Sequence, residues 1–222
     1  MNNDETVFLF DVDNTLLDND RVTEDLKKFL AREVGAERCN HYWQIFEQLR
    51  TELGYADYLG SLQRYRMQYP YDSHLLAISE FLIDYPFRER LFPHALDVIA
   101  HCQRLGKVVI LTDGDVVFQP RKIHSSGLFK AVAGNILVYI HKETELHDVE
   151  RRYPARKYVL VDDKLRILTA IKEAWGERVT TVFPRQGHYA VDAGILAKYP
   201  AADVSIDRIS EIRDLERSLF SV

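Results

Sequence analysis

The sequence contains little cysteine and no long apolar run. Only two cysteines, Cys39 and Cys102, occur among 222 residues, and no CxxC pair is present. We therefore expect free thiols with structural roles, kept reduced in the cytoplasm. No apolar run reaches the length of a bilayer span, and the stretch from Met1 to Thr6 is too polar and acidic for a signal peptide.

Positive charge is not in excess either. The net charge of -5 argues against nucleic acid polymers and membranes as the main partners. Hydrophobic residues make up 46% and charged residues 28% of the chain, which is ordinary for a soluble globular protein. A length of 222 residues suits a core domain with a modest insert. We expect a monomer or a homodimer.

The most informative stretch runs from Val7 to Leu17. Four apolar residues are followed by Asp11 and Asp13, and a continuous apolar run of this kind is typical of a strand buried on both faces. A strand's period of two places the two carboxylates on one side, where they repel each other unless a cation compensates them. Oxygen ligands suit Mg²⁺. The alternative interpretation is an Asp-Asn-Thr turn without a metal.

Two further apolar runs end in polar residues. The strand expected at 107–111 is followed by Thr112, Asp113 and Gly114, where a hydroxyl and free backbone N–H groups make a phosphate cradle or an ordinary turn. The strand expected at 157–161 is followed by Asp162 and Asp163. Adjacent carboxylates at the end of a buried strand are costly without a cation, although one of them could cap a helix.

These motifs, in this order, resemble those of the haloacid dehalogenase (HAD) superfamily, most of whose members are phosphohydrolases. The resemblance also identifies Lys142, after an apolar segment at 136–140, as the third motif, although the proline that commonly follows is Glu143 here. It covers about two thirds of the chain. It implies an α/β fold, with a Rossmann-like parallel sheet between helices, and a site at the carboxyl ends of the strands.

Residues 18–88 differ from the rest because they show helical spacing and no clear strand. We predict about four helices, interrupted near Gly35, Gly54 and Pro70. By resemblance this segment is a helical cap domain of the C1 type, inserted into a core formed by residues 1–17 and 89–222. Six of the tyrosines in the segment could face the substrate, but aromatic residues at helical spacing more often pack a core. They are Tyr42, Tyr55, Tyr58, Tyr65, Tyr69 and Tyr71.

The remaining elements alternate between helix and strand. We expect helices near 93–105, 116–126, 144–151, 165–175 and 209–219, and strands at 179–183 and 202–206, with a short strand at 131–133. The loop from Pro184 to Tyr189, with Arg185 and His188, is expected to be a plain loop that could approach the site.

The resemblance implies a Mg²⁺-dependent phosphohydrolase acting on a small phosphorylated metabolite. Asp11 would be the nucleophile and Asp13 the general acid and base, while Thr112, Asp113, Gly114 and Lys142 would hold the phosphoryl group. Asp11, Asp13, Asp162 and Asp163 would form the metal site, with Asp13 contributing its backbone carbonyl and Asp163 binding directly. Alternatives are a phosphomutase, a dehalogenase and a non-catalytic binding protein; the second aspartate of the first motif and the acidic pair argue against a dehalogenase.

Overall fold

A computed structural model describes residues 6–220 and contains a six-stranded, fully parallel sheet. The strand order is β3-β2-β1-β4-β5-β6, so the order reverses between β1 and β4. The strands are β1 (Thr6–Phe10), β2 (Lys107–Asp113), β3 (Ile136–Tyr139), β4 (Lys157–Val161), β5 (Val179–Pro184) and β6 (Val204–Ile206). This arrangement confirms the predicted Rossmann-like α/β class. The expectation for residues 1–5 lies outside the described residues.

The sheet separates two hydrophobic cores because alternate residues of β1 point to opposite faces. Phe8 and Phe10 pack into one core, and Val7 and Leu9 into the other. The first core is covered by α4 (Ala95–Cys102), α5 (Phe118–Ser126) and α6 (Leu128–Ala131), and the second by α7 (Leu146–Arg152) and α8 (Leu165–Trp175). The short helix α9 (Ala193–Lys198) contributes no buried residue.

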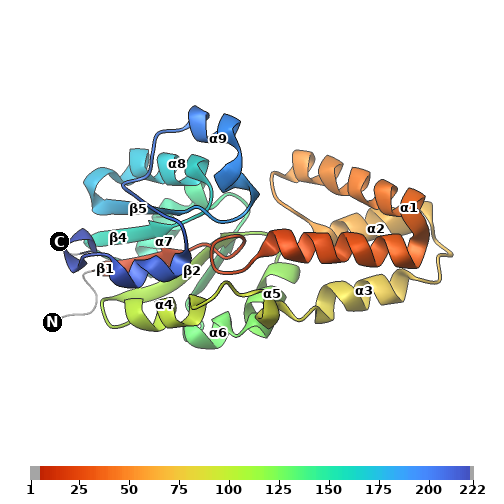
Figure 1. Cartoon of the computed structure of the whole chain (residues 1–222), viewed down its shortest axis with the longest axis horizontal. Coiled ribbons are helices and arrows are strands. Elements are labelled where there is room, and N and C mark those ends of the chain that lie inside the picture. Colours follow the sequence, from red (N-terminus) through yellow and green to blue (C-terminus); the bar gives the residue numbers. More distant parts are fainter. Residues whose placement is uncertain (1–5, 221–222) are drawn as a thin grey trace.

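The helical segment forms a lobe beyond the carboxyl ends of the strands (Figure 1). It consists of α1 (Asn19–Leu53), α2 (Tyr58–Gln68) and α3 (Leu75–Asp84). Gly35 adopts φ 81° and ψ 166°, so α1 is two helices joined at a kink, and four helical segments result as predicted. None of the helices within residues 6–220 combines the length and apolar character that a bilayer span requires.

Two chain crossings connect the helical lobe to the sheet. Leu17 pairs antiparallel with Leu91, the Asp18 amide donates to the Arg90 carbonyl, and the Phe92 amide donates to the Leu16 carbonyl. The change from strand to helix therefore falls close to the boundaries at 18 and 88. Whether the lobe acts as a closing cap stays a prediction.

Several predicted elements differ in the structure. The short strand predicted at 131–133 is wrong: these residues end α6 and turn, with Ala133 at φ 52° and its amide donating to Lys130. The helix predicted near 209–219 is replaced by two 3₁₀ segments. In the first of them Ile209 and Ile212 are buried, and a 3₁₀ helix places residues i and i+3 on the same side. The 3₁₀ segments are η1 (Phe87–Arg90), η2 (Lys142–Thr144), η3 (Gly176–Arg178), η4 (His188–Val191), η5 (Ile209–Asp214) and η6 (Arg217–Phe220).

Candidate active site

The predicted site residues collect where the strand order reverses. Asp11 follows β1, Thr112 and Asp113 end β2, and Asp162 and Asp163 follow β4. Because β1 lies between β2 and β4, these three strand ends are neighbours at one edge of the sheet. Ligands of open α/β sheets bind in the crevice at such a point.

Three carboxylates form a compact cluster at this edge. Asp11, Asp162 and Asp163 are buried, and each offers an oxygen within 4.8 Å of the others. Neither carboxylate oxygen of Asp163 has a hydrogen-bond partner among residues 6–220. Burial raises the pKa of Asp163 well above its usual value, although the Lys164 ammonium opposes that rise. A buried, unpaired carboxylate is costly, so this cluster calls for a positive ligand.

Lys142 lies between two members of the cluster. Its buried Nζ is 2.6 Å from Asp11 Oδ1 and 2.6 Å from Asp162 Oδ2, and donates to the Leu111 carbonyl at 3.3 Å. Burial alone would lower the pKa of Lys142, but the Asp11 and Asp162 carboxylates raise it above its ordinary value. The lysine is therefore held as a cation beside Asp11.

The Asp113 carboxylate is occupied by the backbone of Lys142. Its Oδ1 accepts from the Lys142 amide at 2.7 Å, and burial raises the pKa of Asp113 to about 6. Asp113 thus positions Lys142. Its predicted role in binding phosphate stays a prediction. The Thr112 hydroxyl accepts from Gln119 Nε2 at 3.0 Å, and Gly114 passes so close to Gln119 that a Cβ would lie 2.9 Å from its Cβ.

The residues of the cluster fit a magnesium ion. Asp162 is already engaged, because its Oδ1 accepts from the Lys164 amide at 2.8 Å and its Oδ2 faces Lys142. Asp163 presents two unpaired oxygens, and its amide is fixed by the Thr15 hydroxyl at 3.1 Å. An all-oxygen set of carboxylates is the donor chemistry of Mg²⁺. Both oxygens of Asp163 are therefore available to a cation, and its role as the direct ligand stays a prediction.

Asp13 lies apart from this cluster. Its side chain is 28% exposed, and its Oδ1 accepts from Lys122 Nζ at 2.6 Å. The Asp13 carboxylate is not among the three grouped carboxylates, and the contribution of its backbone carbonyl to a metal stays a prediction. Gln119 and Lys122, both on α5, were missed by the sequence analysis. The available signal was a polar pair at i, i+3 inside a helix whose neighbours Phe118 and Ile123 are buried.

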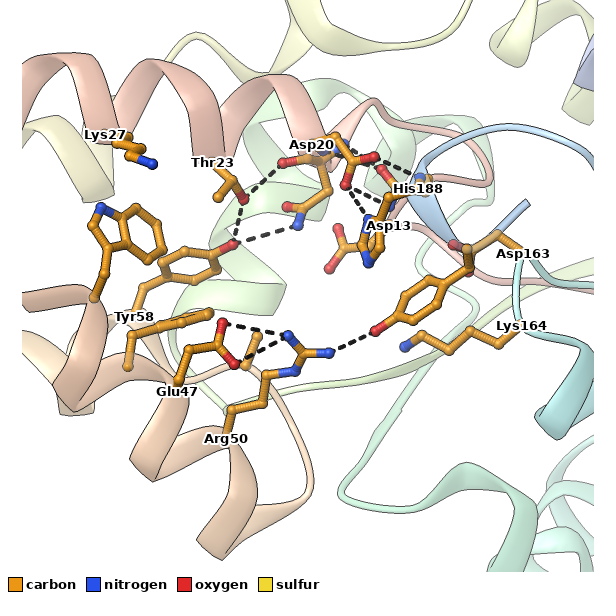
Figure 2. Close-up of a pocket in the computed structure, with 16 residues that line it drawn as sticks. Asp13, Asp20, Thr23, Lys27, Glu47, Arg50, Tyr58, Asp163, Lys164 and His188 are labelled. Atoms are coloured by element: carbon orange, nitrogen blue, oxygen red, sulfur yellow. Dashed lines mark hydrogen bonds and ion pairs between the residues drawn. The ribbon is translucent and has the colours of Figure 1, made fainter. Parts of the chain in front are cut away.

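A cavity of about 630 Å³ separates the site from the helical lobe. Figure 2 shows Asp13, Asp163 and Lys164 on the sheet side and Thr23, Tyr58 and Arg50 on the lobe side. Thr112, Asp113, Gly114, Lys142 and Asp11 do not line this cavity. Tyr58 is buried against the core of the lobe, and burial raises its pKa to about 12. This tyrosine therefore both packs the lobe and bounds the cavity.

The loop after β5 reaches the cavity. His188 donates its amide to Asp20 Oδ2 at 2.7 Å, and its Nδ1 is 2.6 Å from Asp20 Oδ1 (Figure 2). Arg50 of the lobe donates to the Tyr189 hydroxyl at 2.9 Å. The loop therefore continues into η4 and links the sheet to α1 of the lobe. Its turn-forming sequence did not indicate these contacts.

The chain is similar to known proteins over most of its length. The sequence model of the haloacid dehalogenase-like hydrolases matches residues 6–192. The chain belongs to this family. A haloacid dehalogenase-like hydrolase from Burkholderia xenovorans LB400 is 59% identical, with 96% of this chain and 99% of that chain covered and a TM-score of 0.92. None of the curated proteins matches the sequence significantly.

More distant members of the family share the fold. The HAD hydrolase YfnB of Bacillus subtilis, in a magnesium-bound structure, is 18% identical over 95% of this chain and 97% of that chain, with a TM-score of 0.61. The L-2-haloacid dehalogenase of Xanthobacter autotrophicus is 16% identical over 95% and 98%, also with a TM-score of 0.61. At these identities the likeness concerns the fold, and the reaction has to be argued from the site.

Proposed function

We propose that this hydrolase is a Mg²⁺-dependent phosphohydrolase that cleaves a small organic phosphomonoester. The observation that carries the proposal is the buried carboxylate of Asp163, which has no hydrogen-bond partner among residues 6–220 and lies beside Asp11 and Asp162. Displacement of a halide by a carboxylate nucleophile needs no cation to accompany such a cluster. A divalent cation held by Asp11 and Asp163 would compensate its charge.

Asp11 is the proposed nucleophile. Its carboxylate attacks phosphorus, the bond to the ester oxygen breaks, and an aspartyl phosphate forms. Lys142, 2.6 Å from Asp11 Oδ1, orients this carboxylate and places a positive charge where the phosphoryl oxygens would lie. When bound, Mg²⁺ would be held by Asp11, Asp163 and the Asp13 carbonyl, with support from Asp162, and would neutralise charge that repels an anionic nucleophile.

Asp13 is the proposed general acid and base. In the first step its carboxyl group gives a proton to the leaving alkoxide. In the second step the resulting carboxylate takes a proton from water, which attacks phosphorus, breaks the bond to Asp11 and releases inorganic phosphate. Asp13 leaves the cycle in the protonation state in which it entered it, so the cycle is balanced. Its separate location, away from the three grouped carboxylates, suits a role distinct from theirs.

The helical lobe is proposed to be a C1-type cap, with residues 18–88 as the cap and residues 1–17 and 89–222 as the core. The cavity of about 630 Å³ between them suits a small phosphorylated metabolite rather than a polymer. Arg50, Tyr58 and Thr23 reach it from the lobe and are candidates for selecting the substrate. Thr112 and the amides around Gly114 are proposed to support the phosphoryl group.

The test compares two reactions on the same purified protein. We expect hydrolysis of 4-nitrophenyl phosphate with Mg²⁺, loss of activity after chelation, and recovery when Mg²⁺ is returned. Release of chloride from 2-chloropropionate should be absent. Phosphatase activity that survives complete metal removal, or chloride release without phosphatase activity, would contradict the proposal and favour the dehalogenase alternative.

A further inference from the structure

A buried lysine lies behind Asp13 on a helix to which the proposed mechanism gives no role. The Lys122 side chain is 1% exposed, and its Nζ donates to Asp13 Oδ1 at 2.6 Å and to Asn19 Oδ1 at 3.0 Å. The ammonium also lies 5.3 Å from the centroid of the Phe118 ring. Among residues 6–220, Asp13 is its one ion-pair partner. Because a buried ammonium without a counter-charge is costly, Lys122 and Asp13 depend on each other.

The two oxygens of Asp13 are held differently. Oδ1 accepts the short contact from Lys122, whereas Oδ2 has only a contact of 3.5 Å from Gln119 Nε2. The Gln119 amide also donates to the Thr112 hydroxyl at 3.0 Å. Gln119 and Lys122 are one turn apart on α5, so one helix fixes the orientation of Asp13 and the Thr112 hydroxyl together.

We propose that Lys122 is a positioning residue for Asp13. It holds Oδ1 so that Oδ2 stays available for proton transfer, and it links this carboxylate to the helical lobe through Asn19; the inference rests on the proposed phosphohydrolase function. Lys122 does not touch the substrate. It acts by setting the direction of the Asp13 carboxylate.

The link to the lobe follows from the second contact of Lys122. Asn19 is the first residue of α1, lines the cavity, and donates from Nδ2 to the Tyr58 hydroxyl at 3.4 Å. A single ammonium therefore bridges the loop after β1 and the first turn of the lobe. The orientation of Asp13 is coupled to the docking of α1, because moving Asn19 away removes one of the two oxygens that hold Lys122.

The structural test uses Lys122→Met, which keeps most of the length of the side chain and removes its charge, with Arg121→Met as the matched control. Arg121 is adjacent on α5, but its ion pair is with Asp84 of α3, at 2.8 Å. In crystal structures, we expect the Asp13 carboxylate to rotate away in Lys122→Met and to stay in place in Arg121→Met. An Asp13 side chain that keeps its conformation in Lys122→Met would overturn the proposal.

The kinetic test compares substrates with good and poor leaving groups. For an alkyl phosphate, whose leaving group needs a proton, we expect kcat of Lys122→Met to fall about 10²-fold with little change in KM. For 4-nitrophenyl phosphate the fall should be markedly smaller, and Arg121→Met should match the wild type on both. An equal loss on both substrates would indicate a general structural defect and overturn the positioning role.

A paired variant keeps the test decisive if Lys122→Met folds poorly. Asp13→Asn/Lys122→Met removes both charges together, so no buried charge is left alone. We expect it to have the residual kcat of Asp13→Asn alone within about twofold, because Lys122 acts only through Asp13. A further large loss would overturn the inference. A wild type without phosphatase activity would refute the proposed function, whereas the conformation of Asp13 in the crystal structures would still decide the role of Lys122.

Discussion

Asp72 in the helical lobe and Asp163 at the edge of the sheet both have buried side chains, but within the described residues only the carboxylate of Asp72 is hydrogen-bonded. The side chain of Asp72 is 1% exposed and accepts from the Tyr65 hydroxyl at 2.7 Å, the His74 amide at 2.9 Å and Arg38 at 3.0 Å. Together these partners outweigh the burial that raises its pKa and lower it to about 2. Asp163 has no hydrogen-bond partner for either oxygen among residues 6–220, and its pKa is raised.

The comparison shows that this chain can provide hydrogen-bond donors for a buried carboxylate whose role is structural. The lobe surrounds Asp72 with donors, and it therefore contributes to folding. At the site both Asp163 oxygens lack hydrogen bonds from the described part of the chain, which destabilises the protein without its ligand. Such oxygens remain free to bind a ligand. A carboxylate left without donors beside two others is thus the strongest indication of function in the described residues.

The largest expected difference between the two aspartates is in the phosphatase activity of their asparagine variants. Asp163→Asn should lower phosphatase kcat by at least about 10²-fold, as expected when a metal or its electrostatic contribution is lost. Asp72→Asn, the matched control, should retain most of the activity at 25 °C. Steady-state kinetics with 4-nitrophenyl phosphate would measure both, and equal losses would contradict the assignment of Asp163 as a ligand.

The next effect concerns stabilisation by the metal. A ligand that binds only the folded state at 100 times its Kd stabilises it by about 2.7 kcal/mol, so saturating Mg²⁺ should raise the melting temperature of the wild type and of Asp72→Asn. Asp163→Asn should show little rise. Thermal unfolding with and without a chelator tests this, and a full Mg²⁺ shift in Asp163→Asn would place the metal elsewhere.

In the metal-free protein, Asp72→Asn should affect stability more than Asp163→Asn. Asp72→Asn should lower the free energy of unfolding by about 2 kcal/mol, because it disrupts several hydrogen bonds of one carboxylate at once. Asp163→Asn should leave the stability of the metal-free protein unchanged or raise it, since an unpaired buried charge is removed. Denaturant unfolding in a chelating buffer would measure both values. A large destabilisation by Asp163→Asn would mean that its carboxylate has a structural partner.

The smallest effect is in the pH dependence of stability. Because the folded pKa of Asp72, about 2, lies below the usual value of 3.8, its contribution is fully present above about pH 4 and is lost as the pH falls toward 2. Asp72→Asn should flatten this part of the curve. Unfolding free energies between pH 2 and pH 5 would show it. An unchanged slope in the variant would mean that other carboxyl groups account for acid unfolding.

Much of the fold could be predicted because the buried strands are continuous apolar runs. The stretch Val7–Phe10 and the carboxylates that follow it fix one strand end, and the other strand ends follow from the same pattern. The family resemblance then identified Lys142, which lies 2.6 Å from Asp11. These are signals of local sequence, where a strand's end and its side-chain direction follow from a few residues.

The features that were missed depend on contacts between distant segments. Lys122 meets Asp13 across 109 positions, and His188 meets Asp20 across 168, so neither pair leaves a local pattern. The 3₁₀ segments after Ile206 are determined by how Ile209 and Ile212 pack against the core. Tertiary packing decided these elements, whereas local propensity favoured a regular helix.

If Asp11 is the nucleophile, it forms a covalent phosphoryl intermediate, which rapid quenching followed by mass spectrometry can detect. With Mg²⁺ and an aryl phosphate, we expect a phosphoryl group on Asp11 in the wild type. Asp11→Asn should carry none, and Asp13→Asn should be slowed about 10²–10⁴-fold yet still be phosphorylated by a substrate with a good leaving group. A phosphoryl group on Asp13, or on any residue other than Asp11, would mean that Asp11 is not the nucleophile.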